Sequence, residues 1–110
     1  MKIFRVVDFE TTGLGTSAGI VEAAYTDLIW EGKSMEVGET YTGLFDPGIP
    51  IEVGAMAIHH ITEQMIKGTP HPDQFLAKVE EGADFLVFHN AKFDLQYITP
   101  NLPVICTLKC

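Results

Sequence analysis

The amino-acid sequence predicts an α/β domain with a mixed β-sheet. Three strand-like segments come first, and strands alternating with helices follow, an order typical of such a sheet. The change falls at Asp46–Pro50, a turn-rich connection after which the spacing of apolar residues becomes helical. No repeat, low-complexity tract or polar linker divides the chain, so residues 1–110 are predicted to form one domain.

The N-terminal segments are expected to form an antiparallel meander. Lys2–Asp8 is an almost continuous apolar run, typical of a strand covered on both faces, and turn residues follow it. Gly19–Trp30 and Glu39–Phe45 predict a second and a third strand, with Gly32–Ser34 as a hairpin loop between them. Consecutive strands joined by such short loops pair most simply in antiparallel order.

The second half of the chain is predicted to alternate between helices and strands. Thr62 can cap a short helix that runs through Lys67, and Gly68 stands just past its end. The apolar spacing within Asp73–Glu81 predicts another helix. The remaining elements are a buried strand at Phe85–Phe88, a helix that Asn90 caps and that ends before Pro100, and the start of a strand at Val104–Leu108.

Charge and composition restrict the function classes. The 15 acidic residues outnumber the 7 basic ones and give a net charge of −8, which argues against a protein that binds nucleic acid through an overall positive field. An acidic centre that meets phosphate through bound metal cations stays compatible with this charge, because the ions invert the local electrostatics. A chain of this length buries about two-thirds of its unfolded surface, enough for a core.

Neither a membrane span nor a disulfide framework is expected. No stretch approaches the roughly 20 apolar residues that cross a bilayer, and the N-terminus does not resemble a signal peptide. The cysteines are Cys106 and Cys110, too few and too close together for a disulfide scaffold. A reducing, cytoplasmic setting without membrane contact is therefore the expected location.

Two carboxylates, Asp8 and Glu10, stand at the end of the first predicted strand. Residues two apart in an extended chain point to the same side, so both side chains can converge on one point. Two such groups in a dry setting repel each other unless a cation or a proton separates them, and Mg²⁺ prefers carboxylate oxygens, water and phosphate. The alternative interpretation is a pair of solvated acids at a strand end.

Asp94 adds a third carboxylate in a position that favours a metal site. It lies one turn inside the helix that follows the predicted strand Phe85–Phe88. If that strand lies beside the first one, all three acids meet at the same edge of the sheet, where ligands of open α/β sheets collect. The alternative for Asp94 is an exposed helix acid with Lys92 nearby, and Asn90 is explained as a helix cap.

These segments resemble a known family. Val7–Leu14 (VDFETTGL) is similar to the first motif of the DEDD (DnaQ-like) 3′–5′ exonucleases, and His89–Asp94 (HNAKFD) is similar to their second. Asp46–Ile51 and Ala57–Thr62 match the segment that the family usually has between these motifs, with His60 where glycine is common. The resemblance covers essentially the whole chain.

The resemblance implies a ribonuclease-H-like fold and a metal-dependent exonuclease that releases nucleoside 5′-monophosphates from a 3′ end. It implies two Mg²⁺ or Mn²⁺ ions, with Asp8 bridging both, Glu10 binding one and Asp94 helping to hold the other. Single-stranded DNA is the favoured partner, because residues 55–66 and 105–109 look most similar to DNA-degrading members. An exoribonuclease or oligoribonuclease activity and a polymerase proofreading role stay open as alternatives.

The same resemblance implies the residues that contact the substrate. The backbone around Thr11, Thr12 and Gly13 would pack against the terminal nucleotide, and Leu14 would wedge against its base. His59 would line the edge of the cleft, although a helix-end histidine at the surface explains it equally well. Asn90 and Phe93 complete the expected substrate contacts, with Phe93 facing both core and substrate.

The third motif of the family does not occur in the chain. It consists of a histidine five residues before an aspartate, or a tyrosine four residues before it, well beyond the second motif, whereas this chain ends at Cys110. We therefore expect a C-terminally truncated domain with weak or no activity alone, and an exposed edge that a second copy or a partner would cover. The alternative from another class is a non-catalytic remnant of the fold that binds nucleic acid or a protein partner.

Overall fold

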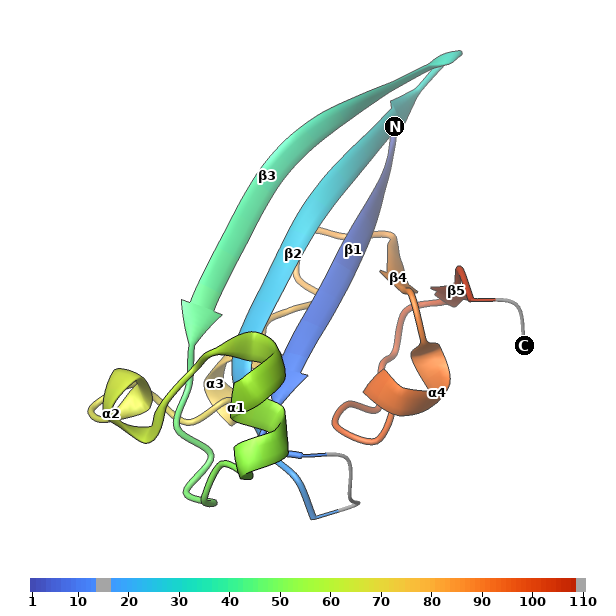
Figure 1. Ribbon diagram of the computed structural model, residues 1–110. Coiled ribbons are helices and arrows are strands. Elements are labelled where there is room, and N and C mark those ends of the chain that lie inside the picture. Colours follow the sequence, from blue (N-terminus) through green and yellow to red (C-terminus); the bar gives the residue numbers. More distant parts are fainter. Residues whose placement is uncertain (14–16, 109–110) are drawn as a thin grey trace.

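A computed structural model describes residues 1–13 and 17–108 and shows a five-stranded sheet in the order β3-β2-β1-β4-β5 (Figure 1). The predicted α/β class with a mixed sheet is confirmed, since β1 pairs antiparallel with β2 and parallel with β4. The elements are β1 (Lys2–Thr11), β2 (Ile20–Glu31), β3 (Ser34–Leu44), α1 (Val53–His59), α2 (Glu63–Ile66), α3 (Asp73–Leu76), β4 (Phe85–Phe88), α4 (Ala91–Asp94) and β5 (Val104–Cys106).

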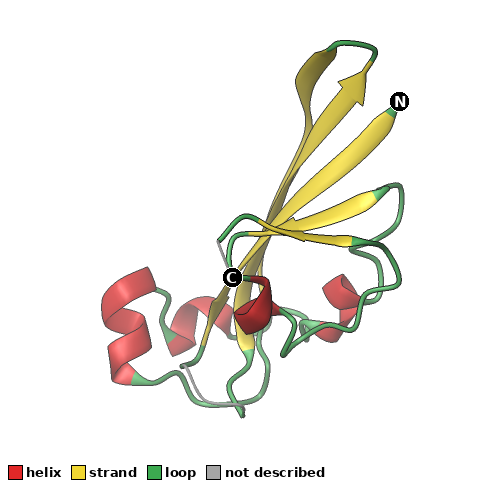
Figure 2. Cartoon of the chain, turned by 90° about the vertical axis from the view of Figure 1, so that its right-hand side faces the viewer, coloured by secondary structure: helices red, strands yellow, loops and turns green. Residues whose placement is uncertain are grey.

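The predicted antiparallel meander is confirmed, and its first and third strands are longer than expected. β1 continues through Asp8 to Thr11, because residues as far as Thr11 stay paired with β2. β3 already begins at Ser34, and the turn between β2 and β3 contains Gly32 with a φ of 62°, which glycine adopts without strain. The β2–β3 hairpin projects beyond the rest of the sheet (Figure 2).

β1 is buried mainly on one face, so the prediction of a strand covered on both faces is wrong. Arg5, Val7 and Phe9 are buried, whereas Phe4 and Val6 on the opposite face are only half-buried. The apolar run misled the prediction because it contains hydrophobic residues on both faces. Only the packing of α3 and α4 decides which of the two faces becomes the core.

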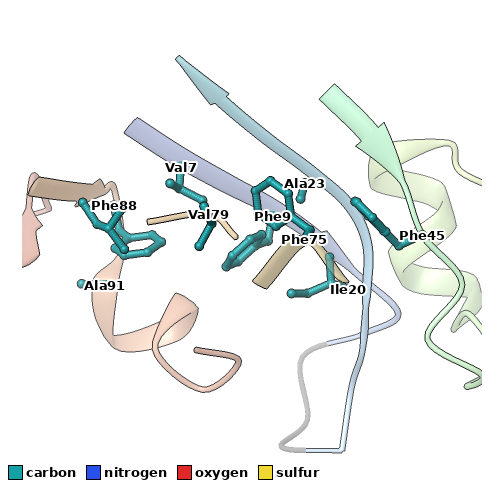
Figure 3. Packing of buried hydrophobic residues seen from close by; sticks show 10 residues of the cluster. Val7, Phe9, Ile20, Ala23, Phe45, Phe75, Val79, Phe88 and Ala91 are labelled. Carbon is teal, nitrogen blue, oxygen red and sulfur yellow. The ribbon is translucent and has the colours of Figure 1, made fainter. Parts of the chain in front are cut away.

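Phenylalanine rings from several elements form this core and hold the end of β1 in place. The ring of Phe9 lies 6.3 Å from that of Phe75 in α3 and 6.2 Å from that of Phe88 in β4. Both Phe88 and Leu86 are completely buried, so the cluster fills the space between the sheet and the helices (Figure 3). The strand end that carries the candidate acids therefore stands on a well-packed base.

A smaller cluster anchors α1 and α2 beside the same end of the meander, where β1 ends and β2 begins (Figure 1). It consists of Val21, Ile51, Ile61 and Ile66, all buried. Val21 faces no residue of β1, because the ladder shifts register between Glu10 and Thr11 and forms a bulge. Bulges turn a strand end and re-aim its side chains, and this one falls directly after Glu10.

The helices are short, and they differ from the prediction in length more than in place. α2 forms as predicted, with the Thr62 hydroxyl accepting a hydrogen bond from the Met65 N–H. α3 ends at Leu76 rather than at Glu81. Residues 77–82 continue as turns, in which the Lys78 N–H donates to the Phe75 carbonyl and the Glu81 N–H donates to the Lys78 carbonyl. The carbonyl groups of Val79 and Glu81 accept hydrogen bonds from the Arg5 guanidinium.

The position of β4 decides where the site lies. β4 pairs with β1 in parallel, with Phe4 opposite Phe85 and Val6 opposite Val87, so both strands point their carboxyl ends to the same edge. β5 then extends the sheet beside β4, as predicted, over Val104–Cys106. No helix in residues 1–13 and 17–108 is long and apolar enough to cross a membrane.

Candidate active site

The three predicted acids lie at the carboxyl ends of β1 and β4. Asp8 and Glu10 are successive residues of one face of β1, and Asp94 is the last residue of α4, which follows β4 directly. Asp8 is exposed, Glu10 is half-buried and Asp94 is only 6 % exposed. The alternative of Asp94 as an exposed helix acid is therefore wrong, since the helix turns it toward the sheet.

Burial and mutual repulsion raise the pKa values of two of these acids. Burial, and after it the charge of Asp8, together raise the pKa of Asp94 from its ordinary value of 3.8 to about 6. Burial also raises the pKa of Glu10, with additional contributions from Asp8 and from Glu22, which lies opposite Glu10 in the β1–β2 ladder. Asp8 is thus electrostatically coupled to both other acids.

These acids suit divalent metal ions in their chemistry. The two salt bridges between described residues join Arg5 to Asp27 and His71 to Asp73, so neither supplies a positive charge to this site. Within residues 1–13 and 17–108, no three His, Cys, Asp or Glu side chains lie close enough together to form a complete metal site. The donors are carboxylates whose repulsion a cation relieves, so the residues fit Mg²⁺ or Mn²⁺.

The segment after Glu10 is held by hydrogen bonds to two other elements. The Thr12 N–H donates to the Gly19 carbonyl over 2.8 Å, and the Thr12 hydroxyl accepts from the Gly19 N–H over 3.0 Å. The Thr12 carbonyl accepts from the Glu52 N–H over 2.8 Å, and the Thr11 hydroxyl donates to the Gly13 carbonyl over 2.7 Å. Thr11 and Thr12 are buried, and their hydroxyl groups are engaged in this network.

A cavity of about 420 Å³ opens beside the acids, between the end of β1, α1 and α4. Glu10 and His59 provide polar groups in its wall, and Phe93 provides an aromatic ring. The other lining residues are Phe9, Thr11, Gly13, Glu52, Gly54, Ala55 and Ile58. Four residues predicted to contact the substrate therefore line one cavity: Thr11, Gly13, His59 and Phe93.

His59 is the last residue of α1 and contacts the strand end directly. Its Nε2 lies 2.9 Å from the Thr11 carbonyl oxygen, and its Nδ1 lies 3.0 Å from the Ile61 N–H. The side chain is half-buried, so the interpretation as a free surface histidine is wrong. It lines the cavity as predicted, but its ring nitrogens are directed at the backbone.

Asn90 stands at the start of α4 but does not cap it through its side chain. Asn90 occupies the N-cap position of α4, but its side chain makes no capping hydrogen bond, and its carbonyl accepts from the Phe93 and Asp94 N–H groups instead. The prediction of a side-chain cap is therefore wrong, because the exposed residue has a φ of −133° and a ψ of 80° that do not suit a cap. Leu14 lies outside the described residues.

Two features of the site were not found from the sequence. α1 carries Val53 and Ile58 at 78 % and 80 % exposure and buries no residue of its own, so no amphipathic pattern marks it. The second feature is the hydroxyl of Tyr97, which is buried and has no hydrogen-bond partner among the described residues. Burial raises the pKa of Tyr97, and the ring packs against Phe93 at 5.7 Å.

The fold and the site define a class of protein: a ribonuclease-H-like domain with a carboxylate centre at the ends of two parallel strands. A family model described as an exonuclease, RNase T, matches residues 6–106 of the chain. The chain belongs to this exonuclease family, and the DnaQ-like resemblance drawn from its motifs is confirmed.

Individual relatives agree with this assignment. Exodeoxyribonuclease 10 of Escherichia coli strain K12 is 38% identical over 109 residues, which cover 97% of this chain and 46% of the relative. A PolC-type DNA polymerase III of Listeria welshimeri is 35% identical over 98 residues, or 86% of this chain and 6% of the polymerase. The chain thus spans about half the length of the first of these relatives and a small part of the second.

A solved structure shows the same fold. Exonuclease X in complex with 5′ overhanging duplex DNA superimposes with a TM-score of 0.77 at 38% identity. The match covers 94% of this chain and 59% of that protein. The ribonuclease-H-like class predicted from the motifs is therefore confirmed at the level of the three-dimensional fold.

Proposed function

We propose that the chain is a metal-dependent 3′–5′ exonuclease domain that acts on the 3′ end of DNA and releases nucleoside 5′-monophosphates. The observation that carries the proposal is the coupling of the three acids. Burial raises the pKa values of both Glu10 and Asp94, the latter to about 6, and the charge of Asp8 adds to each shift. A buried carboxylate that is repelled by a second acid is unfavourable for a protein unless a cation occupies the site.

Asp8, Glu10 and Asp94 would hold the ions, with Asp8 between the other two. When bound, divalent ions lower the pKa of a water molecule and offset the negative charge of a phosphodiester. The chain itself contributes the position of the carboxylates. β1 is packed on Phe75 and Phe88 through Phe9, and Asp94 is held in a buried turn, so little reorganisation is needed when the ions arrive.

The cavity beside the acids would take the terminal nucleotide. Its wall combines the Phe93 ring with the side chains of Ala55 and Ile58, which suits the flat apolar faces of any base. Gly13 leaves space at the mouth, since a Cβ there would lie 1.5 Å from a carboxylate oxygen of Glu52. Such contacts recognise a nucleobase without selecting its sequence, as an exonuclease requires.

DNA is favoured as the substrate by the relatives. Exodeoxyribonuclease 10 acts on DNA by its name, and Exonuclease X was solved with a DNA duplex. The fourth acid and the proton-accepting side chain of the family pattern do not occur in the 110 residues. Since a general base alone contributes about 10²–10⁴-fold in rate, we expect the 110-residue chain by itself to be weak or inactive.

Thermal unfolding with Mn²⁺ tests the metal centre independently of turnover. We expect Mn²⁺ to raise the melting temperature of the wild type and to leave Asp8→Ala unchanged. Glu36→Ala, which removes an exposed acid of the β2–β3 hairpin, is the matched control and should respond like the wild type. An equal response of Asp8→Ala and the wild type would contradict the proposed site.

Binding and trimming of labelled oligonucleotides test the substrate. A 3′-labelled single-stranded DNA and an RNA of the same sequence are incubated with the chain and Mn²⁺, with EDTA as control. DNA binding that needs Mn²⁺ and disappears in Asp8→Ala supports the proposal, and any trimming should start at the 3′ end. Metal-independent binding without trimming would instead indicate the non-catalytic binding module, and preference for RNA would indicate an exoribonuclease.

A further inference from the structure

His59 is bound through both nitrogens of its ring. The Ile61 N–H lies 3.0 Å from Nδ1, and the Thr11 carbonyl oxygen lies 2.9 Å from Nε2. A backbone N–H can only donate a hydrogen bond and a carbonyl can only accept one. These partners together assign the proton to Nε2 and a lone pair to Nδ1, which is the neutral imidazole. In this state neither nitrogen has a lone pair free to receive a proton from water.

The carbonyl that His59 holds belongs to the strand end beside the acids. Thr11 follows Glu10 directly, and the β1–β2 ladder loses its register between these two residues. Because the bulge removes the regular ladder there, the direction of the chain after Glu10 depends on other contacts. The hydrogen bond from His59 is one of them, and it fixes the plane of the peptide that follows Thr11.

α1 is attached to this strand end at both of its termini. The Glu52 N–H at its N-cap binds the Thr12 carbonyl, and His59 at its last position binds the carbonyl of Thr11. The helix itself buries none of its residues, and Ile58 is 80 % exposed. Two hydrogen bonds to consecutive carbonyls, together with the buried residues Ile51 and Ile61 that flank the helix, therefore place the wall of the cavity against Glu10.

We propose that His59 is a positioning residue for the carboxylate centre. In its neutral form the Nε2–H group donates to the Thr11 carbonyl. This hydrogen bond fixes the orientation of Glu10 and keeps α1 against the cavity. The ring neither accepts the proton of the attacking water nor donates to the substrate. This inference rests on the proposed function and deepens it, because it separates the residues that hold the site from those that would carry out the reaction.

Two substitutions of His59 distinguish positioning from proton transfer. Glutamine has an amide N–H that can donate to Thr11 and an oxygen that can accept from Ile61, whereas leucine has neither and fills a similar space. The apparent affinity for Mn²⁺ is measured from thermal unfolding of the full 110-residue chain, and the affinity for single-stranded DNA is measured beside it. His60→Gln, at an exposed neighbouring histidine, is the control.

We expect His59→Gln and His60→Gln to bind Mn²⁺ within a few-fold of the wild type. His59→Leu should lose roughly 10–100-fold in Mn²⁺ affinity, as residues that orient a metal ligand typically do. A His59→Gln variant that loses as much as His59→Leu would overturn the proposal, since glutamine retains both hydrogen bonds. Unchanged Mn²⁺ affinity in a folded His59→Leu would overturn it equally.

Proton–nitrogen correlation NMR of the imidazole rings tests the tautomer without metal or nucleic acid. The expected signature is a neutral His59 ring with the proton on Nε2, and amide shifts of Glu10 and Thr11 that change in His59→Leu but are retained in His59→Gln. A proton on Nδ1 would refute the assignment. If the wild type failed to respond to Mn²⁺, the proposed function would fail, while these spectra would still decide whether His59 positions the strand end.

Discussion

A buried acid lies near each end of β1, and its negative charge is neutralised at one end but not at the other. Toward the N-terminal end, Arg5 reaches Asp27 with hydrogen bonds of 2.7 Å and 2.9 Å, and both residues are about 95 % buried. At the C-terminal end, Asp94 is buried to a similar degree and is repelled by the charge of Asp8, and the salt bridges among described residues do not include it. The buried acid at the first end is neutralised by a cation, whereas the second end has an excess of negative charge.

The difference reflects what each end contributes to the protein. The Arg5 guanidinium also binds the carbonyls of Val79 and Glu81 and lies 4.2 Å from the centre of the Tyr25 ring. Its hydrogen bond to Asp27 raises the pKa of Arg5 above an already high value, so the charge is permanent. An internal cation of this kind holds the groups around it rigidly in place. A group of carboxylates without an internal cation can bind an external one, but its unneutralised charge lowers the stability of the folded protein.

Removal of the internal cation should have the largest effect. Arg5→Met leaves the carboxylate of Asp27 buried without its partner, and we expect a loss of about 3–5 kcal/mol in the free energy of unfolding. Urea denaturation followed by far-ultraviolet circular dichroism measures it. The double variant Arg5→Met/Asp27→Leu should recover most of the loss, because it removes both charges. A loss below about 1 kcal/mol in Arg5→Met would show that the two ends do not differ as described.

Neutralisation of Asp94 should have a smaller effect of the opposite sign. The folded pKa of about 6 exceeds the ordinary 3.8, so the folded state disfavours the ionised form. The corresponding stability is therefore fully present below pH 3.8 and is lost as the pH rises through 6, a loss of about 3 kcal/mol. We expect Asp94→Asn to be more stable than the wild type by about this amount at pH 8, without metal.

The pH dependence of Asp94→Asn provides the control for this prediction. Urea denaturation of the variant and the wild type is compared at pH 8 and near pH 4, where the wild-type carboxyl group is largely protonated. The difference between the two proteins should nearly vanish at the lower pH. A difference that is the same at both pH values would mean that charge is not its cause, and that the two ends of β1 resemble each other electrostatically.

Substitution of Gly13 should have the smallest effect on stability. A Cβ at this position collides only with the end of the Glu52 side chain, which is exposed and can rotate away. We expect Gly13→Ala to change the free energy of unfolding by less than about 0.5 kcal/mol while weakening the binding of single-stranded DNA, because the cavity narrows. Recovery of DNA binding in Gly13→Ala/Glu52→Ala would support this cause. A large loss of stability would indicate that the open space is part of the packed structure.

Much of the architecture follows from local patterns in the chain. Apolar runs and turn residues indicated where each strand lies in the sequence, and β4 forms at Phe85–Phe88 as predicted. The Thr62 cap was also found correctly, because a hydroxyl side chain and the N–H three residues on form a contact within one turn. The acids could be named for the same reason. Asp8, Glu10 and Asp94 stand at defined offsets from two strands whose parallel pairing brings their ends together.

The errors arose where the decisive contact joins distant parts of the chain. α3 is shorter than predicted, and the chain turns after it so that the Val79 carbonyl accepts from Arg5, 74 residues away in the sequence. The capping role of Asn90 failed because the backbone at the end of β4 does not adopt the conformation that a cap needs. α1 was not predicted because hydrogen bonds to the end of β1 hold it in place. Such bonds leave no periodic pattern of apolar residues in the sequence.

The succession of strands along the chain, the choice of the proposed acids and the family resemblance were thus encoded locally, in spacing and residue type. The charge state of the acids, the tautomer of His59 and the difference between the two ends of β1 depend on tertiary structure. Burial, which raises the pKa of Asp94, and the Arg5–Asp27 pair, whose members are 22 residues apart, exist only once the sheet has assembled. Electrostatic energies depend on distance and on exclusion of water, and no linear pattern of residues specifies either.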